Sequence, residues 1–285
     1  MQRLPHSVIE EAVSRAIAED IGRGGIDLTS AATIGENKRA SALFKARQSG
    51  ILSGIDLAVY ALQSCDPDCE IEVLKKDGER LEAGAEILRV NGNARALMLA
   101  ERTALNFLTH LSGIATLTAH FVEETKGTNA KILDTRKTLP GMRALQKYAV
   151  RCGGGHNHRF GLDDAILIKD NHIAVAGGIV SALTAAKAYA GRTVKIEIEV
   201  DTLDQLDEVL ACGLADIVML DNFSLEDLEE AVKRINGKIP CEASGGVTLK
   251  TVGAIAKTGV DYISSGALTH SAPTLDIGLD IEIKG

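Results

Sequence analysis

The chain has 285 residues, of which 45% are apolar, 25% charged and 3% aromatic, and its formal net charge is −8 at pH 7. This composition lies outside the disordered range and supplies enough apolar surface for one large core or two modest ones. The acidic balance and the absence of Trp argue against a general nucleic-acid binder, which needs a basic face and usually stacking rings.

The cysteines and the N-terminal residues bear on the compartment. Only Cys65 and Cys69 are close neighbours, and no second Cys or His pair follows at metal-ligand spacing, so no structural zinc site is expected. Residues 1–7 hold no apolar signal core, and no apolar run approaches the roughly 18 residues of a membrane span. We therefore expect a cytoplasmic protein with reduced thiols and no membrane partner.

The first third of the chain predicts a mixed α/β region. Ser7 and Glu10 have the spacing of a capping box, which predicts a helix that continues to about Asp20. Strands are predicted over residues 42–44, 70–74 and 85–90.

Residues 94–121 have apolar side chains at helical spacing, and Gly113 predicts a break between two helices within this stretch. We interpret the stretch as the joint between two domains. An N-terminal α/β domain is expected over residues 1–112, with residues 271–285 returning to it, and a β/α barrel domain over residues 113–270.

Beyond the joint, short buried strands alternate with helical stretches. The predicted strands are residues 131–133, 165–168, 194–200, 216–220, 240–243 and 262–264. The later strands recur at about the length of one βα unit, so a parallel barrel fits better than an antiparallel sandwich. Six clear strands predict the α/β class with an open, incomplete β/α barrel, unless a seventh strand lies near residues 115–122 in place of a helix.

Polar residues stand at the end of each predicted barrel strand. In a β/α barrel these ends converge on one mouth, where polar residues indicate a shared site and not stability alone. They are Asp134, Arg136, Lys137, Lys169, Asp170, Glu199, Asp221, Asn222, Glu242, Ser244, Ser265 and Gly266.

Two features favour a phosphorylated ligand at this mouth. Ser244-Gly245-Gly246 and Ser264-Ser265-Gly266 follow the last two strands, where the backbone amides of such barrels receive phosphate, although each alone also fits an ordinary turn. Residues 135–172 contain seven Lys or Arg against three Asp, which gives a local excess of four positive charges in an acidic protein.

The glycine-rich segment 152–159 combines two imidazoles with a guanidinium. His156 and His158 are two residues apart, which on a strand would suit a metal, but no third ligand follows nearby. Arg159 can hold a planar carboxylate through two parallel hydrogen bonds. The segment therefore favours contact with a carboxylate or phosphate.

Glu197 and Glu199 alternate with apolar residues, so both side chains point to one face of their strand, which in a barrel is the interior. For Glu197 we favour a buried ion pair with Lys195 or Lys169. Glu199 lies nearer the mouth and is the better candidate for a functional role. Asp221 ends an apolar run and is hard to explain by packing.

Nine motifs follow one another over nearly the whole chain: residues 101–103, 133–143 (LDTRKTLPGMR), 147–150, 153–162 (GGGHNHRFGL), 167–172, 197–200, 220–222, 242–246 and 266–270. This series resembles the quinolinate phosphoribosyltransferases, also called nicotinate-nucleotide pyrophosphorylases, and is far more specific than any lone glycine pattern. Leu139 and Met142 differ from that family only at positions that vary within the motif.

The resemblance implies an N-terminal α/β domain, an open barrel, and a homodimer in which each barrel mouth is closed by the other subunit. It implies that the quinolinate carboxylates bind Arg102 (supplied across the dimer), Arg136, His158, Arg159 and Lys169. It also implies catalytic residues around the ribose and pyrophosphate, Lys137, Glu199 and Asp221, with Mg²⁺ held by Glu199 and Asp221 directly or through water or substrate. Thr135 is a further substrate-binding candidate, and the 5′-phosphate is assigned to Ser244, Gly245, Ser265 and Gly266.

The implied reaction joins quinolinate to phosphoribosyl pyrophosphate and yields nicotinate mononucleotide, pyrophosphate and CO2, a step of NAD biosynthesis. Departure of pyrophosphate leaves positive charge on the sugar, which carboxylates such as Glu199 and Asp221 can stabilise. The glycosylated pyridine nitrogen is then cationic and accepts the electrons released when the adjacent carboxylate leaves as CO2.

Two other functions deserve comparison with this one. A barrel aldolase would use Lys169 or Lys137 as a Schiff-base nucleophile, but such a lysine needs apolar surroundings, and these lysines sit among charges. An accessory protein from a related branch linked to molybdate transport shares the barrel, but the complete set of predicted carboxylate-binding residues argues against it.

Overall fold

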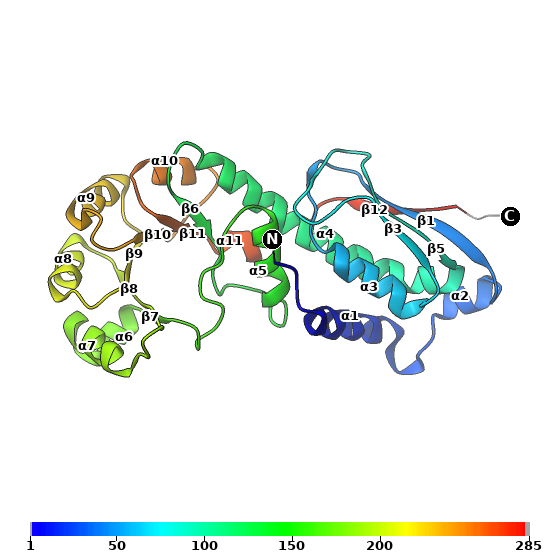
Figure 1. Cartoon of the computed structure of the whole chain (residues 1–285), viewed down its shortest axis with the longest axis horizontal. Helices are drawn as coiled ribbons and strands as arrows, with labels where there is room; N and C mark the ends of the chain where they lie inside the picture. Colours follow the sequence, from blue (N-terminus) through cyan, green and yellow to red (C-terminus); the bar gives the residue numbers. More distant parts are fainter. Residues whose placement is uncertain (1, 283–285) are drawn as a thin grey trace. The chain divides into compact units, whose positions relative to one another are not determined.

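The computed structural model describes residues 2–282, which divide into two compact units. Within these residues, the first unit comprises the chain up to Ala119, Ala144–Gly154 and the residues from Ala272 onward, and the second comprises His120–Arg143 and Gly155–Ser271. Figure 1 labels the elements of both units along the chain. None of the described helices is long and apolar enough to cross a membrane.

The first unit is built on an antiparallel sheet of four strands in the order β12-β1-β5-β3. Alternate residues of β1 are buried, as expected for a sheet with one face on a core. Its strands are β1 (Arg39–Ala46), β3 (Glu70–Val73), β5 (Glu86–Asn93) and β12 (Ile277–Glu282), with a separate pair β2 (Gly50–Ile51) and β4 (Arg80–Leu81). Its helices are α1 (His6–Ile21), η1 (Gly22–Gly24), α2 (Leu28–Thr33) and α3 (Ile55–Cys65), together with most of α4 (Ala94–Glu124) and α5 (Arg143–Cys152).

The predicted capping box at the start of α1 is wrong. The helix begins at His6 with Pro5 as its N-cap, and no side chain caps its first amides. The Pro5 carbonyl accepts hydrogen bonds from the Val8 and Ile9 amides (3.1 and 3.3 Å), so the helix starts before Ser7 can serve as a cap. Ile9 and Val13, one turn apart, bury the inner face of the helix.

The predicted helix break at Gly113 is also wrong, because α4 continues through it to Glu124. The same continuity excludes a seventh strand over residues 115–122. A Cβ built on Gly113 would overlap the carbonyl oxygen of Pro273, so the glycine allows the chain near Pro273 to approach the helix closely. Gly113 therefore serves packing and not helix termination.

Replacing Gly113 with alanine should lower the free energy of unfolding by about 1–3 kcal/mol, the usual cost of adding a methyl group to a packed site. The loss arises because the neighbour of the added Cβ is backbone, which cannot rotate away. Urea unfolding monitored by circular dichroism measures the change. The control is Gly35→Ala, where the Cβ would meet no atom within 4 Å. Equal stability of the Gly113 variant and the native chain would contradict this explanation.

The second unit contains a parallel sheet of six strands in the order β6-β11-β10-β9-β8-β7, which confirms the open β/α barrel class. The strands β6 and β7 form its two edges, so the described strands do not close the barrel. The strands are β6 (Lys131–Leu133), β7 (Ile166–Ile168), β8 (Ile196–Val200), β9 (Ile217–Asp221), β10 (Cys241–Ser244) and β11 (Tyr262–Ser264). The helices are α6 (Asp170–Ala176), α7 (Ile179–Tyr189), α8 (Leu203–Cys212), α9 (Leu225–Ile235), α10 (Val252–Lys257) and α11 (Ala267–His270).

Helix caps keep the strand exits of this unit short. Thr202 accepts a hydrogen bond from the Gln205 amide (3.2 Å) at the start of α8, and Ser224 accepts one from the Asp227 amide (3.1 Å) at the start of α9. Each helix therefore begins within a few residues of its strand. The outer helices α7, α8 and α9 follow one another along the sheet (Figure 1).

The strand register sets the depth of each polar side chain. Glu199 on β8 and Glu242 on β10 both pair with Met219 of the strand between them, so these three residues lie at one level. Asp221 pairs with Ser244 two residues further toward the carboxyl ends. The register thus separates a deep level from an outer level.

Candidate active site

A cavity of about 590 Å³ opens at the carboxyl ends of the barrel strands. It brings together ten of the thirteen predicted site residues, and all of its lining residues belong to the second unit. The lining residues are Thr135, Arg136, Lys137, His158, Arg159, Leu167, Lys169, Glu199, Met219, Asp221, Asn222, Ser244, Gly245, Gly246 and Ser264. The residues that follow the predicted strands therefore meet at one mouth.

One part of the cavity wall is cationic. The Arg136 Nε atom is buried and has no hydrogen-bond partner among the described residues. Burial, and the nearby Arg136 guanidinium, lower the pKa of Arg159, which also donates a hydrogen bond to the Ala165 carbonyl (3.3 Å). Two guanidiniums that repel each other and lack a full set of partners form a site for an anion.

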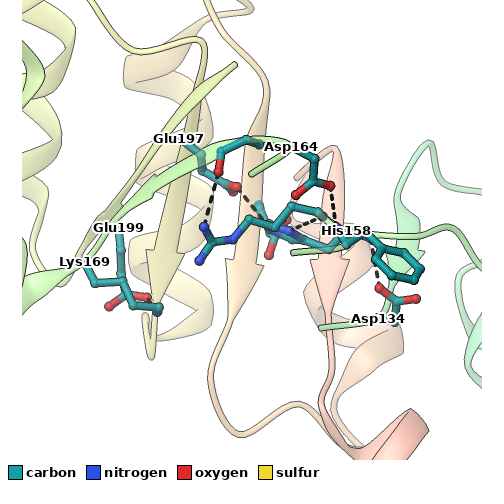
Figure 2. Close-up of polar contacts among 10 residues, drawn as sticks. Asp134, His158, Asp164, Lys169, Glu197 and Glu199 are labelled. Atoms are coloured by element: carbon teal, nitrogen blue, oxygen red, sulfur yellow. Dashed lines mark hydrogen bonds and ion pairs between the residues drawn. The ribbon is translucent and has the colours of Figure 1, made fainter. Parts of the chain in front are cut away.

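The loop that carries Arg159 is fixed from below by a buried aspartate. Asp134 accepts hydrogen bonds from the His158 amide (3.0 Å) and from the Asn157 side chain (2.5 Å). Leu133 and His156 also form a parallel bridge, so the loop continues the edge of the sheet beyond β6. Figure 2 labels Asp134 and His158, which are joined by the amide hydrogen bond. The loop is thus held in position before a ligand arrives.

His158 faces two buried glutamates. Its Nε2 atom lies 3.0 Å from Glu197 Oε2 (Figure 2) and 3.6 Å from Glu242 Oε2. Both glutamate side chains are less than a tenth exposed. The Nδ1 atom accepts a hydrogen bond from the Arg159 amide (2.7 Å), so the ring proton resides on Nε2 and is donated toward the carboxylates. Burial, followed by the Glu197 charge, raises the pKa of Glu242 to about 8.

The predicted ion pair of Glu197 with Lys195 or Lys169 is wrong. Lys195 pairs with Asp216 (3.3 Å) at the opposite end of the strands. Lys169 instead pairs with Glu199, which is 7% exposed and one level nearer the mouth. The partner of Glu197 is His158, contributed by a loop whose course could not be inferred from strand periodicity.

The carboxylates of Glu199 and Asp221 lie on the adjacent strands β8 and β9, and a tight turn supports the second of them. Asp221 Oδ2 accepts a hydrogen bond from the Asn222 side chain (2.6 Å), and Asn222 has a backbone φ of 55°. A Cβ on Gly245 would overlap the side chain of Asn222, and Gly245 itself has a φ of 87°. Only glycine fits this position without strain. The Ser244-Gly245 turn therefore packs directly against the residue that orients Asp221.

The last strand presents a different serine from the one predicted. Ser264 lines the cavity, and its buried hydroxyl faces the Glu242 carboxyl group. The Ser265 hydroxyl donates to the Val247 carbonyl (3.2 Å), and its amide donates to the Leu133 carbonyl (3.1 Å). Ser265 and Gly266 do not line the cavity. A Cβ on Gly266 would lie 2.8 Å from Lys137 Cδ, so this glycine gives the lysine stem room.

Arg102 lies on α4 in the first unit, and it does not line the cavity of the second unit. Its side chain is 66% exposed and lies 3.9 Å from Glu101. Sequence reasoning also left out Leu167 and Met219 as lining residues. Met219 was recoverable, because it precedes Asp221 by two residues and so points to the same face of β9.

Comparison with known proteins gives matches along the whole chain. The quinolinate phosphoribosyl transferase N-terminal domain model matches residues 27–112, and the C-terminal domain model of the same name matches residues 114–280. The carboxylating nicotinate-nucleotide pyrophosphorylase of Mycobacterium leprae is 46% identical over 276 residues, which are 95% of this chain and 96% of the relative. A probable enzyme of that name from Bacillus subtilis is 44% identical over 279 residues, which are 98% of this chain and 95% of the relative.

Solved structures agree with these matches. The nicotinate-nucleotide pyrophosphorylase from Francisella tularensis superimposes with a TM-score of 0.93 at 44% identity, over 98% of both chains. The Ehrlichia chaffeensis structure of the same name gives a TM-score of 0.93 at 38% identity, over 99% of this chain and 100% of the other.

Proposed function

Because the chain belongs to the quinolinate phosphoribosyltransferase family, we propose that the cavity at its barrel mouth is where quinolinate and phosphoribosyl pyrophosphate react. The protein is a phosphoribosyltransferase of NAD biosynthesis, which forms nicotinate mononucleotide with release of pyrophosphate and CO2. The observation that carries the proposed location is the junction, in one cavity, of a cationic wall and two carboxylates.

The cationic wall is the proposed quinolinate subsite. Arg136 and Arg159 offer planar guanidiniums to the two ring carboxylates, and Lys169 offers an ammonium. His158 completes this wall and is fixed by Asp134 through its amide. The unpartnered Arg136 Nε supports this assignment, because an anion would supply the missing acceptor.

The opposite part of the cavity is the proposed sugar subsite. Glu199 and Asp221 face the position where positive charge develops on the ribose as pyrophosphate leaves, and Lys137 receives the leaving group. The turn at Ser244 and Gly245 offers backbone amides to the 5′-phosphate. Thr135 also lines the cavity, whereas Ser265 and Gly266, which the resemblance assigns to the same phosphate, lie outside the lining. The protein thus contributes orientation and electrostatics.

Mg²⁺ is the proposed cofactor, with Glu199 and Asp221 as the residues that would hold it. Their chemistry fits, because Mg²⁺ commonly takes one or two carboxylates together with substrate phosphate oxygens and water. When bound, the ion neutralises negative charge on the pyrophosphate group.

A homodimer and a cytoplasmic location complete the proposal. The dimer rests on the family resemblance, which assigns the exposed Arg102 to the mouth of the partner subunit. The location is supported by the five cysteines, all of which are free thiols, as expected in a reducing compartment.

The reaction is tested by incubating the purified protein with quinolinate, phosphoribosyl pyrophosphate and Mg²⁺. We expect nicotinate mononucleotide and CO2 in equal amounts, and no product when nicotinate replaces quinolinate. A chain that binds neither pyridine acid in titration calorimetry would instead support an accessory role. The aldolase alternative needs a lysine in apolar surroundings, whereas Lys169 lies in an ion pair with Glu199.

Replacing Arg102 with alanine should raise KM for quinolinate by about tenfold or more, because one charge-assisted hydrogen bond of about 1.5–3 kcal/mol is lost. If the residue acts across a dimer, mixing this variant with Lys137→Ala should restore activity, since one mouth of each hybrid dimer then has both residues. The measurement is initial rate against mixing ratio after refolding of the two chains together. Absence of any rescue would place Arg102 in its own subunit or outside the site.

A further inference from the structure

Two carboxylates lie behind the cationic wall and have no role in the reaction described above. Glu197 and Glu242 are 6% and 1% exposed, and the Oε1 atom of each is buried without a hydrogen-bond partner among the described residues. Each Oε2 atom faces the His158 ring. Two ionised carboxylates sharing one neutral imidazole in a buried site would be strongly destabilising, so the cluster needs a further positive charge.

A metal ion is one source of that charge, because the ligand atoms of His158, Glu197 and Glu242 all lie within 4.8 Å of one another. The tautomer of His158 argues against it. A metal on Nε2 leaves Nδ1 as the proton-bearing nitrogen, which normally donates to an acceptor. Here Nδ1 accepts the Arg159 amide instead, so Nε2 is the protonated nitrogen. A proton held by one of the two glutamates is therefore the better source of the positive charge that this cluster needs.

We propose that Glu242 is a positioning residue for quinolinate binding, which stays a neutral acid and so leaves a single negative charge behind Arg159 and Lys169. The inference rests on the quinolinate subsite proposed for these two cations. Glu197 acts electrostatically on Arg159, and Lys169 acts on Glu242, so the charge of the glutamate pair reaches both of them. An ionised Glu242 beside Glu197 would be a second negative charge, and it would compete with the quinolinate carboxylates for Arg159 and Lys169.

The groups that face Glu242 come from four elements. They are Glu197 on β8, Lys169 at the end of β7, Ser264 on β11 and His158 on the glycine-rich loop. Burial and Glu197 favour the neutral acid, whereas His158, the Ser264 hydroxyl and Lys169 favour the ionised form, and the first two prevail to give a pKa of about 8. One pH unit above this value, about one tenth of the enzyme retains the proton, so kcat/KM for quinolinate should fall about tenfold between pH 7 and pH 9.

The kinetic test compares the native enzyme with Glu242→Gln and Glu242→Asp. The ratio of kcat/KM for quinolinate at pH 7 to that at pH 9 should be about ten in the native enzyme. In Glu242→Gln it should be about one, because glutamine cannot ionise. Aspartate can ionise, so it should retain an alkaline fall. KM for phosphoribosyl pyrophosphate, measured at saturating quinolinate, should change little with pH in all three. An alkaline fall that persists in Glu242→Gln overturns the proposal.

A second measurement does not depend on activity. Between the ordinary glutamate pKa of 4.5 and about 8, the folded chain keeps a proton that the unfolded chain releases, so stability falls as pH rises through this window. The melting temperature of Glu242→Gln relative to the native chain should therefore increase from pH 5 to pH 8. A constant difference overturns the proposal, as does stoichiometric Mn²⁺ or Zn²⁺ binding that Glu242→Gln abolishes. A lack of turnover in the native protein would refute the proposed function and leave this stability test intact.

Discussion

Replacing Lys137 with alanine should lower kcat by about 100- to 1,000-fold, the usual loss when one preorganised charge contact to a transition state is removed. The lysine is preorganised by its backbone. Its carbonyl accepts a hydrogen bond from Thr269 Oγ1 (2.7 Å), and its amide donates to Thr135 Oγ1 (3.0 Å). Its stem lies against Gly266. If the ammonium receives the leaving pyrophosphate, as proposed, it matters most when negative charge develops there.

The measurement for Lys137 is single-turnover formation of nicotinate mononucleotide together with steady-state kcat and KM. KM for quinolinate should change little, because this lysine is assigned to the sugar subsite. Lys187→Ala is the matched control, since Lys187 is an exposed lysine on α7 that does not line the cavity. Turnover close to that of the native enzyme would remove Lys137 from the catalytic residues.

The barrel could be predicted from sequence because its information is local. Each of the six strands is a short segment that alternates with a helical stretch, and the predicted positions overlap β6 to β11 throughout. Parallel strands share one carboxyl end, so residues such as Lys169 and Glu199 could be assigned to one mouth without knowledge of the register. The cavity lining confirms that these residues meet.

What could not be predicted depends on residues far apart in the sequence. The function of Gly113 follows from the approach of Pro273, which no local pattern records. The pairing of Glu197 with Glu242 requires that β8 and β10 flank the same strand, together with a loop that brings His158 between them. Periodicity showed which face Glu197 occupies, but it did not identify the groups that face it.

Replacing Glu199 with glutamine should also lower kcat by about 100- to 1,000-fold, and it separates two assigned functions in one side chain. Glu199 is buried on β8 and forms an ion pair with Lys169. Glutamine removes the negative charge that is proposed to stabilise the sugar cation, so turnover should fall. The same change frees the Lys169 ammonium, so quinolinate binding should be preserved or tightened.

The two effects of Glu199→Gln are measured separately, as kcat in the steady state and as the Kd of quinolinate by calorimetry. Glu208→Gln is the control, because Glu208 is an exposed glutamate on α8 outside the cavity lining. If the variant kept its turnover but bound quinolinate more weakly, Glu199 would be a support for Lys169 and not a catalytic carboxylate. A fall in kcat with unchanged or lower Kd places its charge at the reacting sugar, since only an interaction stronger in the transition state than in the bound substrate alters turnover in this way.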